Sequence, residues 1–334
     1  MSVALAVTVR NEQDLLRPNL LHHHHLGVEQ AFVYLDRSTD GTRASVEALG
    51  FVRLAASVGA ARYAGCEALA HALPHVDTHV TARQILDIWD AMAQARAAGL
   101  AWLLVVDADE LVTPALDEAG PGALRALLAA VPAEVECVRF PTLEALQRGE
   151  DYANVFAEAT LFKRDPGRFR RRVKDPLRGR LVTARGFYGH TVGKSALRLS
   201  VDAVPRTPHR FAARDGSALR AATAGHLLHY YCCSFDAFLA KFRRFSDHPD
   251  THLWQVPVEP LKRLWRDVVN HPGFTEADLR AYYRAWVAFD ERAVRRLRRP
   301  TWLGIVPRPP AVVEVTAPRR VFAALAGAPV AAGA

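Results

Sequence analysis

The sequence contains few of the residues on which small extracellular scaffolds and membrane proteins depend. Only four of its 334 residues are cysteines, and no two are spaced as Cys-x-x-Cys, so a disulfide framework and a zinc ribbon are both excluded. The longest apolar run, Ala97–Val106, is about half as long as a membrane-spanning helix. The N-terminal apolar run, Val3–Val9, is too short for a signal peptide. We therefore expect free thiols and a cytoplasmic protein, with peripheral contact at the inner face of the membrane as the alternative.

Lysine is also scarce, since only five of the 43 basic residues are lysines. The formal net charge is +8, and this excess favours an anionic ligand or surface, such as a sugar nucleotide, phospholipid head groups or nucleic acid. Arginine suits bidentate contact with phosphate or carboxylate, although an Ala/Arg-rich coding sequence would give the same composition. Aromatic residues are not interleaved with the basic tract at 170–174, which argues against a single-strand nucleic-acid binder.

Strands and helices alternate over the first 115 or so residues. This alternation predicts an open parallel sheet with right-handed crossovers, in which ligands bind at the carboxyl ends of the strands. We predict strands at 3–9, within 28–35, at 51–54 and at 100–106, with helices after Asp14, at 42–49 and at 81–98. Pro18 should lie in the first helix's first turn or kink that helix. Three strand ends then carry polar residues: Arg10-Asn11-Glu12, Asp36 and Asp107-Ala108-Asp109.

The C-terminal part of the sequence is predicted to be mainly helical. Ser234 can cap a helix whose apolar face includes Phe235, Phe238 and Phe242. A second long helix is expected over Thr275–Arg298. After Pro300 the chain is rich in proline and alanine, and we expect irregular structure with a short helix near 320–326.

Two acidic motifs carry the clearest chemical information. Asp107 and Asp109 follow a buried strand, and their oxygens suit Mg²⁺ or Mn²⁺ shared with substrate phosphates. Acids that merely end a strand in solvent would show the same pattern. Asp36 can accept hydrogen bonds from a base or ribose, and Ser38 is a second candidate, while Asp40-Gly41-Thr42 is explained by turn and cap formation alone.

Taken in order, these motifs resemble the family 2-type and family 92-type glycosyltransferases of the GT-A fold. The resemblance extends from Val3 to Lys241 and does not include 140–185, where the acceptor side is expected. The matching elements are Arg10-Asn11-Glu12, His23-His24-His25-Leu26-Gly27-Val28, Asp36 to Thr42, Gln84, Asp107 to Glu110, Gly193-Lys194-Ser195, and His229-Tyr230-x-x-Ser234-x-x-x-Phe238-x-x-Lys241.

The resemblance implies an α/β fold with an open, mostly parallel sheet flanked by helices and followed by a helical C-terminal region. We accordingly predict a GT-A domain at 1–233, a helical region at 234–299 and a Pro/Ala-rich tail at 300–334. It also implies a nucleotide-sugar donor, most readily a UDP-sugar, held by Mn²⁺ or Mg²⁺. Asp36 would contact the uracil or ribose, Asp107 the ribose or metal, and Asp109 the metal, with His229, ahead of His226, as a further metal ligand. The residues expected to bind the donor are Arg10, Asn11, Glu12, Asp36, Ser38, Gln84, Asp107 and Lys194.

The remaining candidates are less sharply defined by the sequence. A general base is needed if the reaction inverts the anomeric carbon; Glu158, Glu144 and Asp175 are eligible, and we prefer Glu158. The run His22–His25 spreads around a helix, so at most two of its rings share a face, and we expect packing rather than metal binding. The basic tract at 170–174 would bind diphosphate or an anionic acceptor, or else form a solvated face.

We therefore expect a metal-dependent glycosyltransferase that moves a hexose from a nucleotide diphosphate sugar to a glycan or lipid-linked acceptor. One alternative is a sugar-phosphate nucleotidyltransferase. That enzyme would need a glycine-rich basic loop after the first strand, where this chain has Arg10-Asn11-Glu12-Gln13-Asp14. The other alternative is a non-catalytic nucleotide- or anion-binding module.

Overall fold

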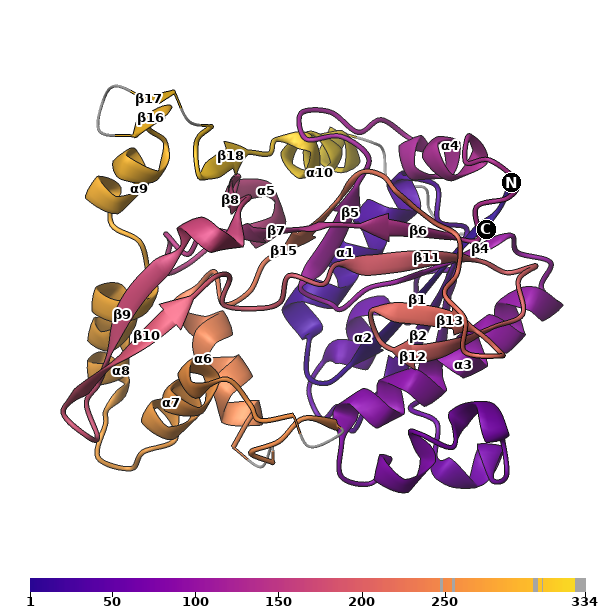
Figure 1. The fold of residues 1–334 in the computed structure, drawn as a ribbon, viewed down its shortest axis with the longest axis horizontal. Coiled ribbons are helices and arrows are strands. Elements are labelled where there is room, and N and C mark those ends of the chain that lie inside the picture. The colour runs from indigo at the N-terminus through magenta and orange to yellow at the C-terminus, as the bar shows by residue number, and fades with distance from the viewer. Residues whose placement is uncertain (247–248, 254–255, 303–305, 308, 328–334) are drawn as a thin grey trace. The chain divides into compact units, whose positions relative to one another are not determined.

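The computed structural model describes residues 1–246, 249–253, 256–302, 306–307 and 309–327 (Figure 1). The chain forms two compact units. Unit 1 comprises Met1–Thr142, Val192–Leu227 and Arg320–Ala334, and unit 2 comprises Leu143–Thr191 and Leu228–Arg319. The domain boundaries predicted at 233/234 and 299/300 both fall inside unit 2, and that division stays a prediction.

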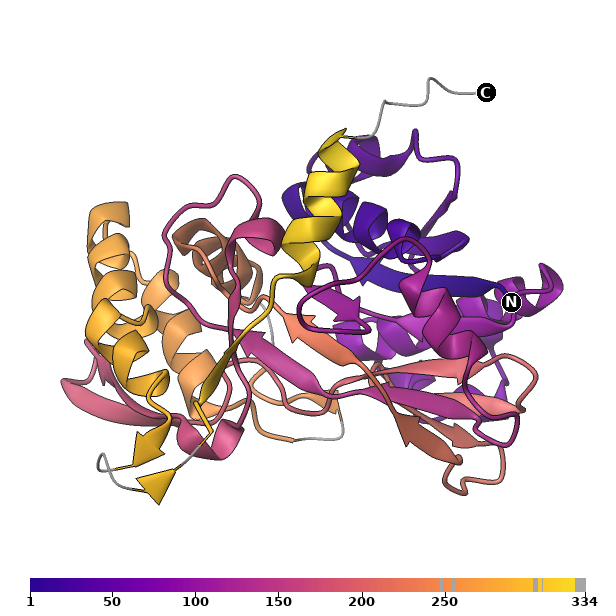
Figure 2. The same ribbon diagram turned by 90° about the horizontal axis from the view of Figure 1, so that it is seen from above.

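Unit 1 is built on a seven-stranded sheet in the order β14-β6-β11-β4-β1-β2-β3. Strands β1 to β4 are parallel to one another. Strand β11 runs antiparallel to both of its neighbours, β4 and β6. The predicted open, mostly parallel sheet flanked by helices is confirmed (Figure 2). The strands are β1 Val3–Val9, β2 Gln30–Leu35, β3 Val52–Ala56, β4 Trp102–Val105, β6 Cys137–Phe140, β11 Lys194–Arg198 and β14 Ala221–Thr223.

Register brings the strand ends of unit 1 to one edge. Val9 pairs with Leu35, and Ala6 pairs with Val105, so the chain leaves β1, β2 and β4 on the same side of the sheet. The apolar β1 is almost wholly buried, as expected for a parallel strand covered on both faces. The expected convergence of the three polar strand ends is thus present in unit 1.

Helices and a hairpin complete unit 1. The helix α1 starts at Gln13, so Pro18 is its sixth residue. Of the two alternatives for that proline, the first-turn position is wrong and the kink stays a prediction. Gly27 follows α1 with φ +103°, the left-handed conformation that favours glycine at a helix end. The remaining elements are α1 Gln13–His25, α2 Thr42–Val46, α3 Val80–Ala97, α4 Ala123–Ala129, β5 Glu110–Thr113, the hairpin β12 Ala203–Thr207 and β13 Arg210–Ala213, the 3-10 turns at Ala60–Tyr63, Glu67–Leu69 and Leu73–His75, and α10 Ala317–Gly327, whose first turn precedes Arg320.

Unit 2 combines a small sheet, a basic hairpin and a helical group. In the sheet, neighbouring strands follow the order β18-β8-β7-β15. The first residue of β7 and the first two residues of β15 are assigned to unit 1, and the rest of both strands to unit 2. The elements are β7 Thr142–Ala145, α5 Val155–Glu158, β8 Leu161–Lys163, a 3-10 turn at Pro166–Arg168, the hairpin β9 Arg170–Asp175 and β10 Arg180–Arg185, β15 His226–His229, α6 Phe235–Arg244, α7 Pro260–Val269, α8 Glu276–Tyr282, α9 Glu291–Leu297, the pair β16 Thr301–Trp302 and β17 Val306–Pro307, and β18 Val312–Glu314.

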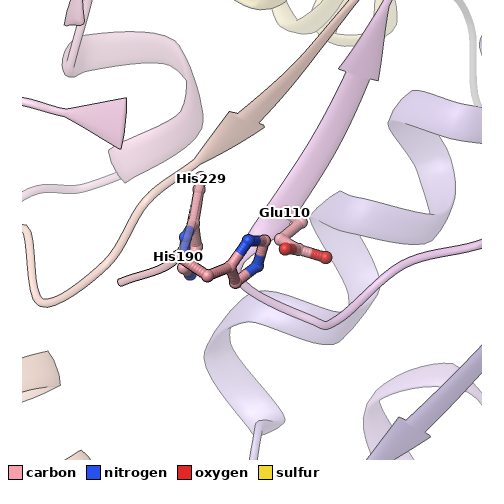
Figure 3. A group of neighbouring side chains, drawn as sticks. All are labelled: Glu110, His190 and His229. Carbon is pink, nitrogen blue, oxygen red and sulfur yellow. The ribbon is translucent and has the colours of Figure 1, made fainter. Parts of the chain in front are cut away.

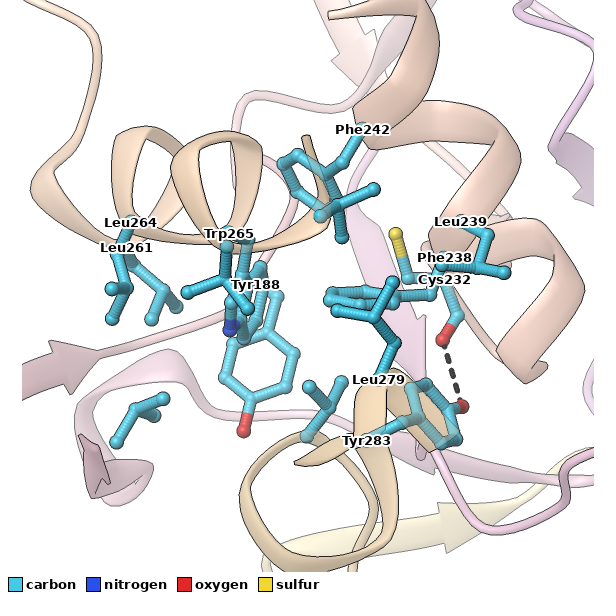
Figure 4. Close-up of a cluster of buried hydrophobic side chains, with 14 of the residues drawn as sticks. Tyr188, Cys232, Phe238, Leu239, Phe242, Leu261, Leu264, Trp265, Leu279 and Tyr283 are labelled. Carbon is cyan, nitrogen blue, oxygen red and sulfur yellow. Dashed lines mark hydrogen bonds between the residues drawn. The ribbon is translucent and has the colours of Figure 1, made fainter. Parts of the chain in front are cut away.

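An aromatic core holds the helices of unit 2 together (Figure 4). Phe238 and Phe242 of α6 pack edge-on against Trp265 of α7, with ring centroids 5.7 and 5.5 Å away. The Tyr283 hydroxyl donates to the backbone oxygen of Cys232 at 3.1 Å. The predicted cap of α6 is confirmed, because the Ser234 hydroxyl accepts a hydrogen bond from the backbone N–H of Ala237.

The long helix predicted over Thr275–Arg298 is wrong. After α8 the chain forms a π-helical turn at Tyr283–Val287, and Ala288 is extended. Asp290 then accepts from the backbone N–H of Ala293 and caps the separate helix α9. Among the described residues, no helix is both long and apolar enough to cross a bilayer.

Candidate functional site

Two loops at the carboxyl edge of the unit 1 sheet are joined by side-chain hydrogen bonds. The Ser38 hydroxyl accepts from the backbone N–H of Asn11 at 3.1 Å, and the Asn11 side-chain oxygen accepts from the backbone N–H of Thr39 at 2.8 Å. The backbone N–H of Glu12 donates to the Thr42 hydroxyl at 2.8 Å. Asn11 and Ser38, both predicted to bind the donor, therefore shape the loops, whereas Arg10 is exposed beside them.

The end of β2 carries a buried ion pair. The Asp36 carboxylate accepts two hydrogen bonds from the Arg83 guanidinium, at 2.8 and 2.9 Å, and only 1% of Asp36 and 8% of Arg83 are exposed. A third Arg83 nitrogen donates to the backbone oxygen of Val76 at 2.8 Å. Arg83 is not among the predicted site residues, although it directly precedes Gln84. Bidentate pairing of this kind fixes both side chains.

A cavity opens beside this ion pair. Its volume is about 470 Å³, within the range of small-molecule sites. Asp36, Ser38 and Arg83 contribute to its wall, together with Ser57 and Val58 from the segment after β3. Arg37, in the left-handed region at φ +57°, also lines it; that backbone conformation is uncommon for a residue other than glycine and is often found at functional sites. This cavity is the candidate nucleoside site.

The end of β4 carries a second buried cluster. The Asp107 carboxylate accepts from the Lys194 ammonium at 2.8 Å and from the Gln84 amide at 3.0 Å. Lys194 is fully buried, and its ammonium also lies 3.4 Å from the Glu110 carboxylate. Burial by itself lowers the pKa of Lys194, but the carboxylates of Asp107 and Glu110 outweigh it, so the pKa is raised. The structure thus brings three predicted residues together, and adds Glu110, which the sequence analysis quoted without assigning it a role.

The turn after β4 offers hard oxygen donors for a divalent cation. Asp107 accepts one hydrogen bond on each carboxylate oxygen, and a carboxylate has about four lone-pair sites, so it retains acceptor capacity. Asp109 lies in the same turn and is partly exposed. Carboxylate oxygens are the ligands that Mg²⁺ and Mn²⁺ prefer. The donor set therefore fits such an ion, with Asp107 and Asp109 both partly exposed.

Asp87 of α3 is almost fully buried and binds two residues of the candidate nucleoside cavity's wall. It accepts hydrogen bonds from the hydroxyls of Thr8 and Ser57, each at 2.8 Å, and from the backbone N–H of Val58 at 2.7 Å. Burial, opposed by these three hydrogen bonds, raises the pKa of Asp87 to about 7. The carboxyl group therefore ties β1 and the cavity wall to α3 and titrates near neutrality.

His229, the predicted additional metal ligand, belongs to unit 2. It is buried, and its ring stacks on that of His190 with centroids 4.6 Å apart (Figure 3). Gly189 explains part of this packing, because a Cβ there would lie 2.3 Å from His229 Cε1. The sequence analysis singled out neither His190 nor Gly189. Since Asp107 and Asp109 belong to unit 1, the role of His229 at the metal stays a prediction.

Each candidate general base has a local hydrogen-bonding role in unit 2. Glu158 is exposed and accepts from the backbone N–H of Asn154 at 2.6 Å. Glu144 is fully buried, paired with Lys163 at 2.7 Å; burial raises its pKa, but Lys163 and His229 outweigh this and lower it. Asp175 ends β9 and contacts Arg178 and Arg180. No distance favours one of these three carboxylates, so Glu158 stays a prediction.

The histidine run in α1 is part of the packing of unit 1. His22 and His23 are fully buried and contact the backbone of Val112 in β5. Burial lowers the pKa of His22 to about 3 and that of His23 to about 4, so both rings are neutral at physiological pH. This agrees with the expected packing role.

Comparison with known proteins gives limited sequence similarity. No family model matches the chain. Two glycosyltransferase-like proteins of Arabidopsis thaliana are 34% and 31% identical to it over 134 residues, which is 39% of this chain. The aligned part spans only 29% and 25% of those relatives' own lengths.

Solved structures resemble the chain only loosely. TarS 1–349 of S. aureus aligns with 85% of this chain and 72% of its own at 13% identity and a TM-score of 0.34. Glucosyl-3-phosphoglycerate synthase from Mycobacterium tuberculosis, in complex with Mn²⁺, UDP and phosphoglyceric acid, aligns over 77% and 88% at 13% identity and the same TM-score. Over the 134 aligned residues, the chain is similar in sequence to the two glycosyltransferase-like proteins of Arabidopsis, in keeping with the resemblance of its motifs.

Proposed function

We propose that the protein is a metal-dependent glycosyltransferase that transfers a hexose from a nucleotide diphosphate sugar, most readily a UDP-sugar, to a glycan or lipid-linked acceptor. The observation that carries this proposal lies within unit 1. The ends of β1, β2 and β4 reach one sheet edge, where a nucleoside-sized cavity and the Asp107–Lys194 pair are found. Ligands of open α/β sheets bind at this edge.

The nucleoside would occupy the cavity beside Asp36. Because Arg83 already binds both Asp36 oxygens, the carboxylate is held in one position and can accept from a base or ribose through its remaining lone pairs. The wall adds the hydroxyls of Ser38 and Ser57. These groups suit the polar edges of a nucleoside. They favour a ligand with neutral hydrogen-bonding groups over one that places a second anion beside Asp36.

The diphosphate would lie toward the end of β4. Asp109, with Asp107, would hold Mn²⁺ or Mg²⁺, which when bound neutralises charge on the departing nucleoside diphosphate. Lys194 holds one Asp107 carboxylate oxygen in place, and Gln84 fixes the other. We retain His229 as a further ligand on the basis of the sequence resemblance. We retain Glu158 as general base only because it is a carboxylate that follows the metal motif in the sequence.

Thermal unfolding with UDP and Mn²⁺, added singly and together, tests the proposal. A ligand present at 100 times its Kd stabilises the folded state by about 2.7 kcal/mol. Because the metal and the diphosphate would share one site, we expect UDP and Mn²⁺ together to raise the unfolding midpoint by more than the sum of their separate shifts. Asp109→Ala should abolish that synergy. Glu134→Ala, which removes one exposed acid elsewhere in unit 1, should preserve it. A shift with a nucleoside triphosphate and none with UDP would contradict the proposal and favour a nucleotidyltransferase.

A further inference from the structure

Unit 2 contains a cavity that the proposed donor site does not use. Its volume is about 500 Å³, and it lies between the β9–β10 hairpin and the segment from the π-helical turn to α9. Among the described residues, five arginines and one acid, Asp290, line it. The arginines are Arg168, Arg170, Arg171, Arg284 and Arg296.

Several of these positive charges are not balanced by carboxylates. Arg170, Arg171 and Arg296 form no ion pair with any acid among the described residues. Arg171 instead donates to the backbone oxygens of Val287 and Ala285, at 2.9 and 3.2 Å. These neutral acceptors orient the guanidinium and leave its charge in place.

Two acids near the cavity offset part of this charge, and a third is paired with a lysine. Glu150 binds the guanidinium of Arg284 through both carboxylate oxygens. Asp290 accepts the capping hydrogen bond from the backbone N–H of Ala293. The buried Glu144 is paired with Lys163, whose ammonium lies 3.9 Å from the centre of the Tyr188 ring. The cavity therefore keeps a net positive lining.

Aromatic and aliphatic side chains form the rest of the wall. Phe169, Tyr188 and Phe289 all contribute to it. The Arg171 guanidinium stacks over the Phe289 ring at 4.7 Å, which restricts its motion and presents its edge for hydrogen bonding. A volume of this size exceeds what a bare inorganic anion would fill. The lining therefore suits an anionic group attached to an apolar or ring-shaped body.

We propose that this cavity, the unit 2 arginine cavity, binds a phosphate monoester, with the phosphate on Arg170, Arg171 and Arg296 and the attached body against Phe169 and Phe289. Guanidinium groups match phosphate oxygens in a bidentate manner and remain charged at all physiological pH values. The phosphate could be carried by a sugar or by a prenyl chain. This site stands on unit 2 alone and does not depend on the proposed transferase activity.

Titration calorimetry of the full chain with glucose 1-phosphate, geranyl phosphate and inorganic phosphate tests this site. We expect at least one organic phosphate to bind ten times more tightly than inorganic phosphate, and the preferred one identifies the carrier. The double variant Arg170→Glu/Arg296→Glu should weaken that binding at least tenfold. The matched control Arg172→Glu/Arg295→Glu changes the same charge on the same elements at exposed positions that do not line the cavity, and should change affinity less than twofold.

Two results would overturn the arginine cavity as a phosphate site. One is equal weakening in both double variants, which would indicate unspecific attraction to a basic surface. The other is failure of the unaltered protein to bind any of the three probes at millimolar concentration. UDP binding with Mn²⁺, measured on the same samples, should be unchanged in both variants, so a failure of the donor site would be recognised separately.

Discussion

Lys194 is the residue on which the end of β4 depends. Its buried ammonium contacts both Asp107 and Glu110, and Glu110 is itself fully buried. The Gly-Lys-Ser element predicted a functional lysine, and the structure shows the contacts through which it would act. Arg83 could not be predicted in the same way, since its partner Asp36 is 47 residues away and a basic residue in a helix is usually exposed.

Replacing Lys194 by Met should destabilise unit 1 strongly. Removing one partner of a buried ion pair costs about 3–5 kcal/mol, because the other charge stays buried without compensation. Urea unfolding at pH 7 measures the loss of stability, with Lys174→Met, at an exposed position of β9, as control. A midpoint within error of the unaltered protein would contradict the assigned contacts.

Asp87 predicts a definite pH dependence. Its folded-state pKa of about 7 lies above the ordinary value of 3.8, so between pH 4 and pH 7 the folded state holds a proton that the unfolded state has lost. Stability must then fall as pH rises through this window, by at most about 1.4 kcal/mol per pH unit. Asp87→Asn cannot titrate, so its stability relative to the unaltered protein should rise from pH 4 to pH 8. A pH-independent difference would show that Asp87 is ionised throughout.

At the scale of elements, helix α6 gives a structural reason for part of the motif His229-Tyr230-x-x-Ser234-x-x-x-Phe238-x-x-Lys241. Ser234 caps the helix, Phe238 enters the aromatic core, and the Lys241 ammonium lies 4.1 Å from the centre of the Tyr231 ring. The spacing therefore reports helix geometry. Periodicity predicted α6 well for the same reason.

Apolar periodicity wrongly predicted one continuous helix over Thr275–Arg298. Apolar residues keep their helical spacing there, although the helix is interrupted between α8 and α9. Asp290 is a common type of N-cap residue, and it starts α9. The π-helical turn before it depends on packing within unit 2, where Tyr283 and Val287 are fully buried. Such tertiary effects are not visible in a local pattern.

The cap of α6 can be tested by substitution at one position. Ser234→Ala should lower the free energy of unfolding by about 1 kcal/mol, because the backbone N–H of Ala237 loses its acceptor. Ser234→Asp should recover most of that loss, since its carboxylate can accept the same bond. Chemical denaturation of the three proteins compares them. Equal loss in both variants would contradict the capping role and point to another function of the hydroxyl.

At the scale of the whole molecule, the order of strands and helices predicted the α/β sheet of unit 1 because that pattern is local and strongly periodic. The division into units was less accessible. The segment 192–227 and the part of α10 from Arg320 belong to unit 1, although unit 2 residues precede each of them in the sequence. Only long-range contacts determine such an arrangement. The arginine cavity shows the same limit, because the tract at 170–174 divides into residues that line it and residues that face solvent.

Anomalous X-ray scattering from crystals soaked with UDP and Mn²⁺ tests the donor site most directly. We predict a manganese peak within bonding distance of the Asp109 carboxylate, and a nucleoside in the cavity lined by Asp36, Ser57 and Arg83. A nucleotide bound elsewhere, or a manganese ion that contacts neither Asp107 nor Asp109, would contradict the account.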